Sequence, residues 1–459
     1  MTVYTNTSRS TANGFPHSST SPCETPSLDR ALLLPGTAEA LDRTMLLMRD
    51  DVRAEVANAL LLEALLAPRV VLVADAPKLA SAAAQSAFIA TALLFLRSGA
   101  SVTLDAPDLA LHGPQPPLVG TRLVSALCDA GGALMQDVTC SGDLSRAGAA
   151  DIVVLFGDSR WCGSALLVLV VSANAVTSTM RAFASVRDAF GERWPTVAHG
   201  PFGGLAAAAL AAAEGYKYVM RSLRDVARLP MHVNTLFAVS RDAQFTFDAG
   251  VGVSDTALTE RLGSGVELGA VDVLSAGAIT QAALFALARI PSKADAPGAI
   301  GTLRILEPER SDASNLNRYS LLLASALGAL KVDTLAAMDL GGITVVPYPT
   351  RYTWESLVML RGHAPAVLVG VDHIPTRWTA QRAHPEWLGV GATSHHSAMS
   401  SEHSRGGPCT WCLHPDNFVG GRKHPHRGVR LPLGRASPFL AARHGGPACA
   451  AGVHHAAPE

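Results

Sequence analysis

Five polar side chains that could bind phosphate groups lie close together in the second half of the chain. The run Glu307-Pro-Glu-Arg-Ser-Asp-Ala-Ser-Asn-Leu-Asn-Arg318 supplies Ser314, Asn315, Asn317 and Arg318, and Lys331 follows thirteen residues later. We expect a helix to begin near Asn315, where free backbone N–H groups and the helix dipole attract anions. Taken singly, each residue could be a helix cap or a solvated charge. As an ordered set they predict a site for a triphosphate-sized anion.

Two acidic residues follow apolar runs that are typical of buried parallel strands. Residues 301–307 end on Glu307, and residues 366–372 end on Asp372. Ligands of open α/β sheets bind beyond the carboxyl ends of the strands, and a carboxylate there can accept hydrogen bonds from ribose hydroxyls. We therefore expect Glu307 and Asp372 to lie at one edge of a sheet.

The turn that follows an expected strand at residues 271–275 gives a weaker signal. It reads Ser275-Ala-Gly277-Ala-Ile-Thr280 and retains only the middle glycine of G-x-G-x-x-G, the one that lets the backbone approach a phosphate. An ordinary strand-to-helix turn is the alternative interpretation.

Strands and helices alternate around these residues. In the second half we expect strands at 271–275, 301–307, 343–347 and 366–372, and helices at 281–289, 315–338 and 352–359. The first half shows the same plan, with strands at 69–75 and 101–105 and a helix at 82–97. The pattern predicts an α/β protein with two tandem Rossmann-like, doubly wound sheets.

The first of these halves lacks a glycine turn. Ala74-Asp75-Ala76-Pro77-Lys78 stands where a phosphate-binding turn would be needed, and its side chains would obstruct the approach of a phosphate to the backbone. We expect this half to be unable to bind a nucleotide.

The length of 459 residues suits two large domains with flanking segments. We expect a disordered leader at 1–29, an inactive Rossmann-like domain at 30–240, an active domain at 255–415, and an irregular, basic tail rich in His, Arg, Pro and Gly at 416–459.

Composition excludes several classes of partner. The chain has 37 Lys and Arg residues against 38 Asp and Glu residues, so its charge favours neither nucleic acid nor an anionic membrane. Its apolar runs are shorter than the roughly 20 residues of a membrane span. The first residues lack the features of a secretory signal, and the seven cysteines show no disulfide framework. We expect a cytoplasmic protein with reduced thiols.

The pattern Glu-x-Glu-x-x-x-x-Ser-Asn-Leu-Asn-Arg, with Lys331 and Asp372 after it, resembles the adenylation core of the ubiquitin-activating superfamily, which includes ThiF and MoeB. The resemblance covers about a third of the chain and implies a ThiF-type second sheet that binds ATP and Mg²⁺. It implies a ribose-binding role for Glu307, phosphate contacts for Asn315, Arg318 and Lys331, and an association with magnesium for Asp372. From their own positions, Gly277, Ser314 and Asn317 are expected to join this nucleotide site. Arg318, Lys331 and Asp372 are the expected catalytic residues. The family usually has Asp where this chain has Glu307, and glycines where it has Ser275 and Thr280.

The same resemblance implies a reaction and partners. The C-terminal carboxylate of a small ubiquitin-like protein attacks the α-phosphate of ATP, and pyrophosphate leaves. A cysteine then captures the acyl group as a thioester in many members, before transfer to a conjugating enzyme. Positioning and charge neutralisation would be the work of the enzyme.

A Cys-x-x-Cys pair could bind zinc. Cys409-Thr-Trp-Cys412-Leu resembles half of the zinc knuckle of these enzymes, although a structural zinc site usually needs four ligands. A reactive thiol and inert cysteines are the alternatives for this pair.

An inactive half followed by an active one resembles the tandem activating enzymes of bacterial ubiquitin-like conjugation operons, some of them antiphage systems. Such a chain is an intramolecular pseudo-dimer, and its inactive half usually lends an arginine to the active site. Arg43, Arg49 and Arg53 are candidates. Two other functions remain open, a non-catalytic scaffold or partner subunit and an NAD(P)-dependent oxidoreductase.

Overall fold

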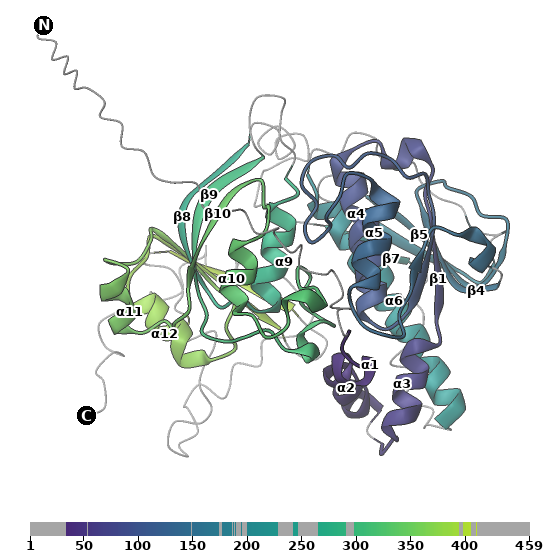
Figure 1. Ribbon diagram of the computed structural model, residues 1–459, viewed down its shortest axis with the longest axis horizontal. Helices are drawn as coiled ribbons and strands as arrows, with labels where there is room; N and C mark the ends of the chain where they lie inside the picture. Colours follow the sequence, from purple (N-terminus) through teal and green to yellow (C-terminus); the bar gives the residue numbers. More distant parts are fainter. Residues whose placement is uncertain are drawn as a thin grey trace, which may run out of the picture. The chain divides into compact units, whose positions relative to one another are not determined.

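The computed structural model describes two sheets, each with its own helices (Figure 1). It describes residues 34–52, 54–147, 149–173, 177–185, 187, 189, 194, 200–227, 242–246, 265–290, 298–393, 398–404 and 410. The expected leader and the expected basic tail lie outside these residues.

The first sheet has seven strands in the order β3-β2-β1-β4-β5-β6-β7. The strands are β1 (Arg69–Val73), β2 (Ser101–Asp105), β3 (Cys140–Ser141), β4 (Ala149–Phe156), β5 (Ser164–Ala173), β6 (Thr177–Phe183) and β7 (Asp242–Thr246). Strands β1 to β5 pair in parallel, whereas β6 and β7 are antiparallel to their neighbours. Four consecutive buried residues in β1, Val70 to Val73, have the continuous apolar character of a parallel strand covered on both faces.

The helices of this half are α1 (Thr37–Ala40), α2 (Asp42–Val52), α3 (Asn58–Leu66), α4 (Ala82–Arg97), α5 (Leu123–Gly132) and α6 (Phe202–Ala227). Helix α4 is almost wholly buried and packs along α6. Ser81 caps its first turn by accepting a hydrogen bond from the amide of Ala84. Gly99 follows its end with a positive φ of 100°, a conformation that glycine adopts at little cost.

The second sheet has six strands in the order β10-β9-β8-β11-β12-β13. They are β8 (Val266–Leu274), β9 (Ala299–Leu306), β10 (Gly342–Tyr348), β11 (Ala366–Val369), β12 (Trp387–Thr393) and β13 (Ala398–Ser404). All neighbours pair in parallel except β12 and β13. The order reverses at β8, which is the first strand in sequence and lies between β9 and β11. This reversal is the switch point at which doubly wound sheets bind ligands.

Helices cover both faces of the second sheet (Figure 1). Helices α9 (Ala278–Leu287) and α10 (Lys331–Ala336) share an apolar core with one face of β8 and β9, which includes Val273 and Ile305. Helices α11 (Trp354–Met359) and α12 (Ile374–Arg382) pack over the other face, which includes Leu274 and Leu306. Adjacent residues of one strand thus enter different cores, as the pleat requires. The expected α/β fold with two tandem Rossmann-like sheets is confirmed.

One expected helix is wrong. Residues 315–338 do not form a continuous helix: Ala313–Asn315 is a single 3₁₀ turn, Ala324–Ala326 is another, and only Lys331–Ala336 is α-helical. Residues 311–330 instead form a closed loop whose ends are paired, since Arg310 and Leu330 form an antiparallel bridge and the amide of Ser311 donates to the carbonyl of Ala329 at 2.8 Å. The apolar residues Leu316, Leu321 and Leu322 fill the loop and are buried.

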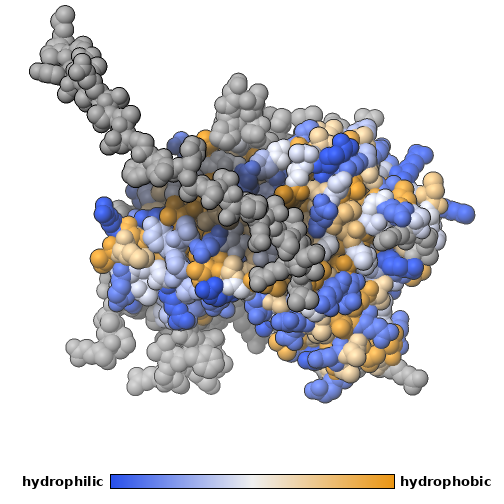
Figure 2. Space-filling view, viewed as in Figure 1, coloured by the Kyte–Doolittle hydropathy of each residue, from blue (hydrophilic) through white to orange (hydrophobic). Residues whose placement is uncertain are grey.

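Polar and apolar residues are interspersed over the described part of the face in Figure 2. None of the helices described is long and apolar enough to cross a bilayer.

Candidate functional site

The carboxyl ends of three neighbouring strands lie level in the second sheet. In the strand register Leu274 of β8 pairs with Leu306 of β9 and with Val369 of β11. Gly277, Glu307 and Asp372 follow these three strands, so their backbones lie at the same edge of the sheet, as expected for Glu307 and Asp372. Asp372 lies three residues beyond Val369 rather than at the end of the strand itself, and it is exposed.

Glu307 braces the turn between β8 and α9. The residue is 8% exposed. Its carboxylate accepts hydrogen bonds from the hydroxyl of Ser275 at 3.2 Å, the amide of Ala276 at 3.3 Å and the amide of Glu309 at 3.1 Å. A carboxylate has about four acceptor positions, so room for a further donor is left. The residue is both part of the turn and able to receive a hydroxyl.

Ser275 occupies the position of the first fingerprint glycine and has a positive φ of 90°. A side chain in this region costs on the order of 1–2 kcal/mol. Its hydroxyl offsets part of this cost, because it also accepts a hydrogen bond from the amide of Gly277 at 2.9 Å. The turn therefore keeps a glycine-like backbone without glycine.

Thr280 stands where the third fingerprint glycine would be. A Cβ added at Gly370, just after β11, would lie 2.9 Å from the Thr280 hydroxyl oxygen. The absence of a side chain at Gly370 thus makes room for Thr280, and close packing of the helix on the sheet is retained.

The first turn of α9 is open to an anion. Gly277 is its N-cap and supplies no side-chain cap, and within the described chain no acceptor is found for the amides of Ala278, Ile279 and Thr280. Thr280 is 1% exposed, and its buried hydroxyl has no hydrogen-bond partner among the described residues. Unpaired N–H groups at the start of a helix attract negative charge.

Tyr319 links the turn to the two expected cations. A Cβ added at Gly277 would lie 3.7 Å from the Tyr319 hydroxyl. Arg318 and Lys331 each place their charged group 5.4 Å from the centre of the Tyr319 ring. The structure therefore gathers Gly277, Arg318 and Lys331 around a buried tyrosine that the sequence analysis did not single out. Its position directly after Arg318 was the available signal.

Lys331 is 4% exposed, and its ammonium donates to the carboxylate of Glu309 at 2.5 Å. Burial disfavours its charge, but the hydrogen bond from Lys331 to Glu309 and the nearby oxygens of Tyr319 and Glu307 outweigh burial, so the pKa of Lys331 is raised. The lysine is charged at neutral pH. Glu309 holds it from an exposed position, with 67% of the glutamate side chain accessible.

The two asparagines form contacts within the protein. Asn315 is buried, and its side-chain oxygen accepts a hydrogen bond from the amide of Asp312 at 3.1 Å, while Asp312 caps the same turn. Asn317 donates to the hydroxyl of Thr44 in α2 at 2.8 Å. Arg318 is exposed and donates to the carbonyl of Ser314 at 2.5 Å. Of the loop residues expected to touch phosphate, Arg318 is the one with its side chain at the surface.

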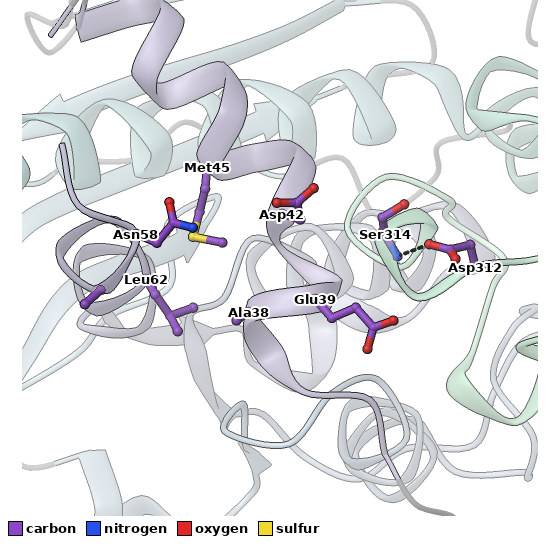
Figure 3. A pocket seen from close by; sticks show the side chains of 9 residues that line it. Ala38, Glu39, Asp42, Met45, Asn58, Leu62, Asp312 and Ser314 are labelled. Carbon is purple, nitrogen blue, oxygen red and sulfur yellow. Dashed lines mark hydrogen bonds between the residues drawn. The ribbon is translucent and has the colours of Figure 1, made fainter. Parts of the chain in front are cut away.

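A cavity of about 700 Å³ adjoins the loop (Figure 3). Glu39 and Asp42 of the α1–α2 segment lie on one wall, and Asp312 and Ser314 of the loop on the other. Three carboxylates in one cavity disfavour a polyphosphate. Only Ser314 of the expected phosphate-binding residues lines it, so this cavity is distinct from the expected nucleotide position.

The turn after β1 in the first half is closed by its own side chains. Asp75 accepts a hydrogen bond from the amide of Lys78, and the Lys78 ammonium lies 2.6 Å from the carboxylate of Asp158. This arrangement favours the expectation that the first half binds no nucleotide.

The expected metal ligands are only partly described. Cys409 and Cys412 lie outside the described residues, and within those residues no group of three or more His, Cys, Asp or Glu side chains could hold a metal ion. The exposed carboxylate of Asp372 is one oxygen ligand, which suits Mg²⁺ when phosphates and water complete the shell.

Among the described residues, the expected arginines Arg43 and Arg49 of α2 make no contact with the loop. Arg49 donates to the carbonyl of Val56 at 3.4 Å, Arg43 is exposed, and Arg53 lies outside the described residues. Another arginine of the first half, Arg97, does reach the loop by donating to the carbonyl of Leu316 at 2.6 Å. Its position at the end of a buried helix gave no sequence signal for this contact.

No family model matches the chain. The uncharacterized protein y4jF of Sinorhizobium fredii is 30% identical over 174 residues, which cover 37% of this chain and 32% of that protein. The match thus spans about a third of the length of this curated relative.

Several solved structures are weakly similar. E. coli MccB with MccA-N7isoASN is 13% identical over 40% of this chain and 66% of that one, with a TM-score of 0.28. E. coli TcdA, a tRNA N6-threonylcarbamoyladenosine dehydratase solved with AMP, is 18% identical over 31% of this chain and 63% of its own, with a TM-score of 0.23. PaaA is 12% identical over 46% of this chain and 79% of its own, with a TM-score of 0.30. Similarity at this level assigns no function to the chain.

Proposed function

We propose that this chain is an ATP-dependent adenylating enzyme of the ThiF and MoeB kind, which activates the C-terminal carboxylate of a small ubiquitin-like protein. One observation carries the proposal. The open first turn of α9, the carboxylate of Glu307 and the cations Arg318 and Lys331 all belong to one edge of the second sheet. A nucleotide needs these three kinds of group, for its phosphates, its ribose and its charge.

Each residue then has a role. Glu307 accepts hydrogen bonds from the ribose hydroxyls, and the amides at the start of α9 bind the α-phosphate. Arg318 and Lys331 neutralise the phosphates as the carboxylate attacks, because two anions must approach each other. Asp372 would hold Mg²⁺, which supplies further neutralisation of the leaving pyrophosphate. The partner's carboxylate oxygen bonds to the α-phosphorus, and the bond to the β-phosphate oxygen breaks.

Lys331 must exchange partners for this role. Its ammonium is held by Glu309, whose side chain is mostly exposed. A phosphate is a competing acceptor with more charge, so binding of ATP would displace Glu309 into solvent. The same pairing also supports the alternative of a non-catalytic scaffold, in which Lys331 and Glu309 simply stabilise the loop.

The remaining expectations belong to the same proposal. The first half would complete an intramolecular pseudo-dimer, and a thioester with a cysteine and transfer to a conjugating enzyme would follow adenylation. Zinc at Cys409 and Cys412 would be structural. An NAD(P)-dependent oxidoreductase is disfavoured, because hydride transfer gives Arg318 and Lys331 no function.

Trapping of the activated carboxylate tests the proposal. The full chain is incubated with ATP, Mg²⁺, hydroxylamine and candidate ubiquitin-like proteins, and the partner is analysed by mass spectrometry. An acyl-adenylate reacts with hydroxylamine to give a hydroxamate and AMP. Formation of a C-terminal hydroxamate only in the presence of ATP supports adenylation. ATP binding without a hydroxamate on any partner favours the non-catalytic scaffold.

A further inference from the structure

Arg97 of the first half is hydrogen bonded to the loop that carries Arg318 and Tyr319. It is the last residue of α4 and 2% exposed. Its guanidinium donates to the carbonyl oxygens of Leu316 at 2.6 Å, Ser320 at 3.1 Å and Leu322 at 2.7 Å. These three carbonyls flank Arg318 and Tyr319 on both sides.

The contact explains why the loop is not helical. In a helix the carbonyl of Leu316 would accept the amide of residue 320, and each later carbonyl would accept in the same way. Here no backbone amide of the described residues donates to the three carbonyls, and Arg97 donates to them instead. A residue 219 positions earlier in the chain thus supplies the hydrogen bonds that a helix would have supplied.

The guanidinium of Arg97 is a buried charge. It is fully buried, and burial lowers the pKa of Arg97 to about 9. Within the described part of the chain its hydrogen bonds go only to carbonyl oxygens, and its Nε atom has no hydrogen-bond partner there. A buried charge is costly unless its surroundings are arranged around it. The charge of Arg97 therefore favours one conformation of the loop carbonyls.

A second buried arginine offers a matched control. Arg289, two residues beyond the end of α9, is also 2% exposed and also connects the two halves, since it donates to the carbonyl of Pro116 at 2.6 Å. Its other contacts are with Phe285, whose carbonyl accepts a hydrogen bond from Arg289 at 2.9 Å. Among the described residues Arg289 makes no contact with the loop of residues 312–322, so its loss removes the same kind of group from a different place.

We propose that Arg97 is a positioning residue of the nucleotide site, which fixes Arg318 and Tyr319 by binding the carbonyls around them and does not touch the nucleotide itself. The catalytic consequence rests on the function proposed above, whereas the effect on the loop does not. The active half would then depend on the inactive half for the shape of its phosphate-binding loop.

The test compares Arg97→Met, Arg97→Lys and Arg289→Met in the full chain. Hydrogen exchange of the amides of residues 312–322 reports the loop, and ATP–pyrophosphate exchange reports KM for ATP and kcat. For Arg97→Met we expect faster amide exchange in the loop and a loss of kcat/KM on the order of 10- to 100-fold, the usual cost of a misplaced group. Arg97→Lys, which keeps a charged donor, should recover part of both.

Arg289→Met should leave the amide protection of the loop and the ratio of KM to kcat at the wild-type values. This should hold even if it lowers the melting temperature as much as Arg97→Met does. Equal loop protection in Arg97→Met and wild type would overturn the inference, as would equal effects of the two methionine variants. If Arg97→Met does not fold, Arg97→Lys decides by the same readouts. If the wild type shows no pyrophosphate exchange, the proposed function fails, but loop protection still decides whether Arg97 positions the loop.

Discussion

Ser275 and Glu307 are hydrogen bonded across the carboxyl ends of β8 and β9, with the serine hydroxyl 3.2 Å from the glutamate carboxylate. Ser275 has a positive φ of 90°, which would suit glycine. The hydrogen bond and the strained backbone belong to the same turn, so the hydrogen bond offsets part of the free-energy cost of the strained backbone. This pair allows a turn without its first glycine to keep the shape that a phosphate site needs.

Substitutions at Ser275 should separate these two contributions. Ser275→Ala keeps a Cβ at positive φ and loses the hydroxyl, so we expect it to lower the free energy of unfolding by about 1–2 kcal/mol. Ser275→Gly also loses the hydroxyl but relieves the backbone, and it should be more stable than the alanine variant by about 1 kcal/mol. Urea unfolding measures both. An alanine variant as stable as the glycine variant would show that the turn is unstrained.

The ion pair between Asp272 and Arg304 should stabilise the second sheet. Asp272 is 0% exposed, and Arg304 on the neighbouring strand donates to both of its oxygens, at 2.6 and 2.9 Å. Arg304→Met leaves a buried carboxylate without its cation, held only by the amide of Ala364 at 2.8 Å among the described residues, and we expect a loss of about 3–5 kcal/mol in the free energy of unfolding. Asp272→Asn in the same background removes the charge and should restore part of the loss. A double variant no more stable than Arg304→Met would contradict this explanation.

Glu309 and Lys331 should act in opposite directions on ATP binding. Glu309→Gln removes the anion that holds Lys331, so ATP should bind more tightly. Lys331→Met removes the cation, and binding should weaken about tenfold, which corresponds to about 1.4 kcal/mol. Calorimetric titration measures both, with Glu63→Gln, an exposed acid of α3, as the control. Weaker binding in Glu309→Gln would instead mean that the ion pair itself shapes the site.

The contribution of Lys331 to ATP binding should not depend on pH near neutrality. Its pKa is raised above the ordinary value of about 10.4, so its charge is complete at pH 6.5 and at pH 8.5. The corresponding contribution to stability is present below about pH 10 and is lost as the pH rises through the raised pKa. If the loss of ATP affinity caused by Lys331→Met differed between pH 6.5 and pH 8.5, another titrating group would be responsible.

Cys128 of α5 should be a reactive thiol near neutral pH. A hydrogen bond with Cys140 outweighs burial and lowers the pKa of Cys128 below that of an ordinary thiol. The thiolate is the nucleophile, so alkylation of Cys128 by iodoacetamide should reach half its maximal rate at a lower pH than alkylation of the exposed Cys162. Peptide mass spectrometry assigns the site. Cys140→Ala should move this midpoint to higher pH, and an unchanged midpoint would rule out Cys140 as the cause.

The fold and the sheet edge could be predicted because their signals are local. Apolar runs of strand length, helical spacing and acids after strands located the strands of the second sheet and placed Glu307 directly after β9. The loop after Glu307 could not be predicted in this way. Its sequence suits a helix as well as a turn, and the deciding donor is Arg97, which lies in another element far away in the chain.

The same limit applied to individual side chains. Asn315 was expected to contact phosphate, with a helix cap as the alternative, and its side chain completes the capping box with Asp312. Tyr319 was not singled out in the sequence, although it is buried and its ring lies beside both expected cations. Capping and cation–aromatic contacts depend on geometry that composition and spacing do not contain.

The most direct test of the proposed function is ATP–pyrophosphate exchange by the full chain in the presence of small ubiquitin-like proteins. Arg318→Ala and Asp372→Ala are compared with Arg160→Ala, which removes an exposed arginine of the first half. We predict partner-dependent exchange in the wild type and in Arg160→Ala, and a loss of at least about tenfold in the other two variants. ATP binding without exchange for any partner, or exchange that survives both Arg318→Ala and Asp372→Ala, would contradict the proposal.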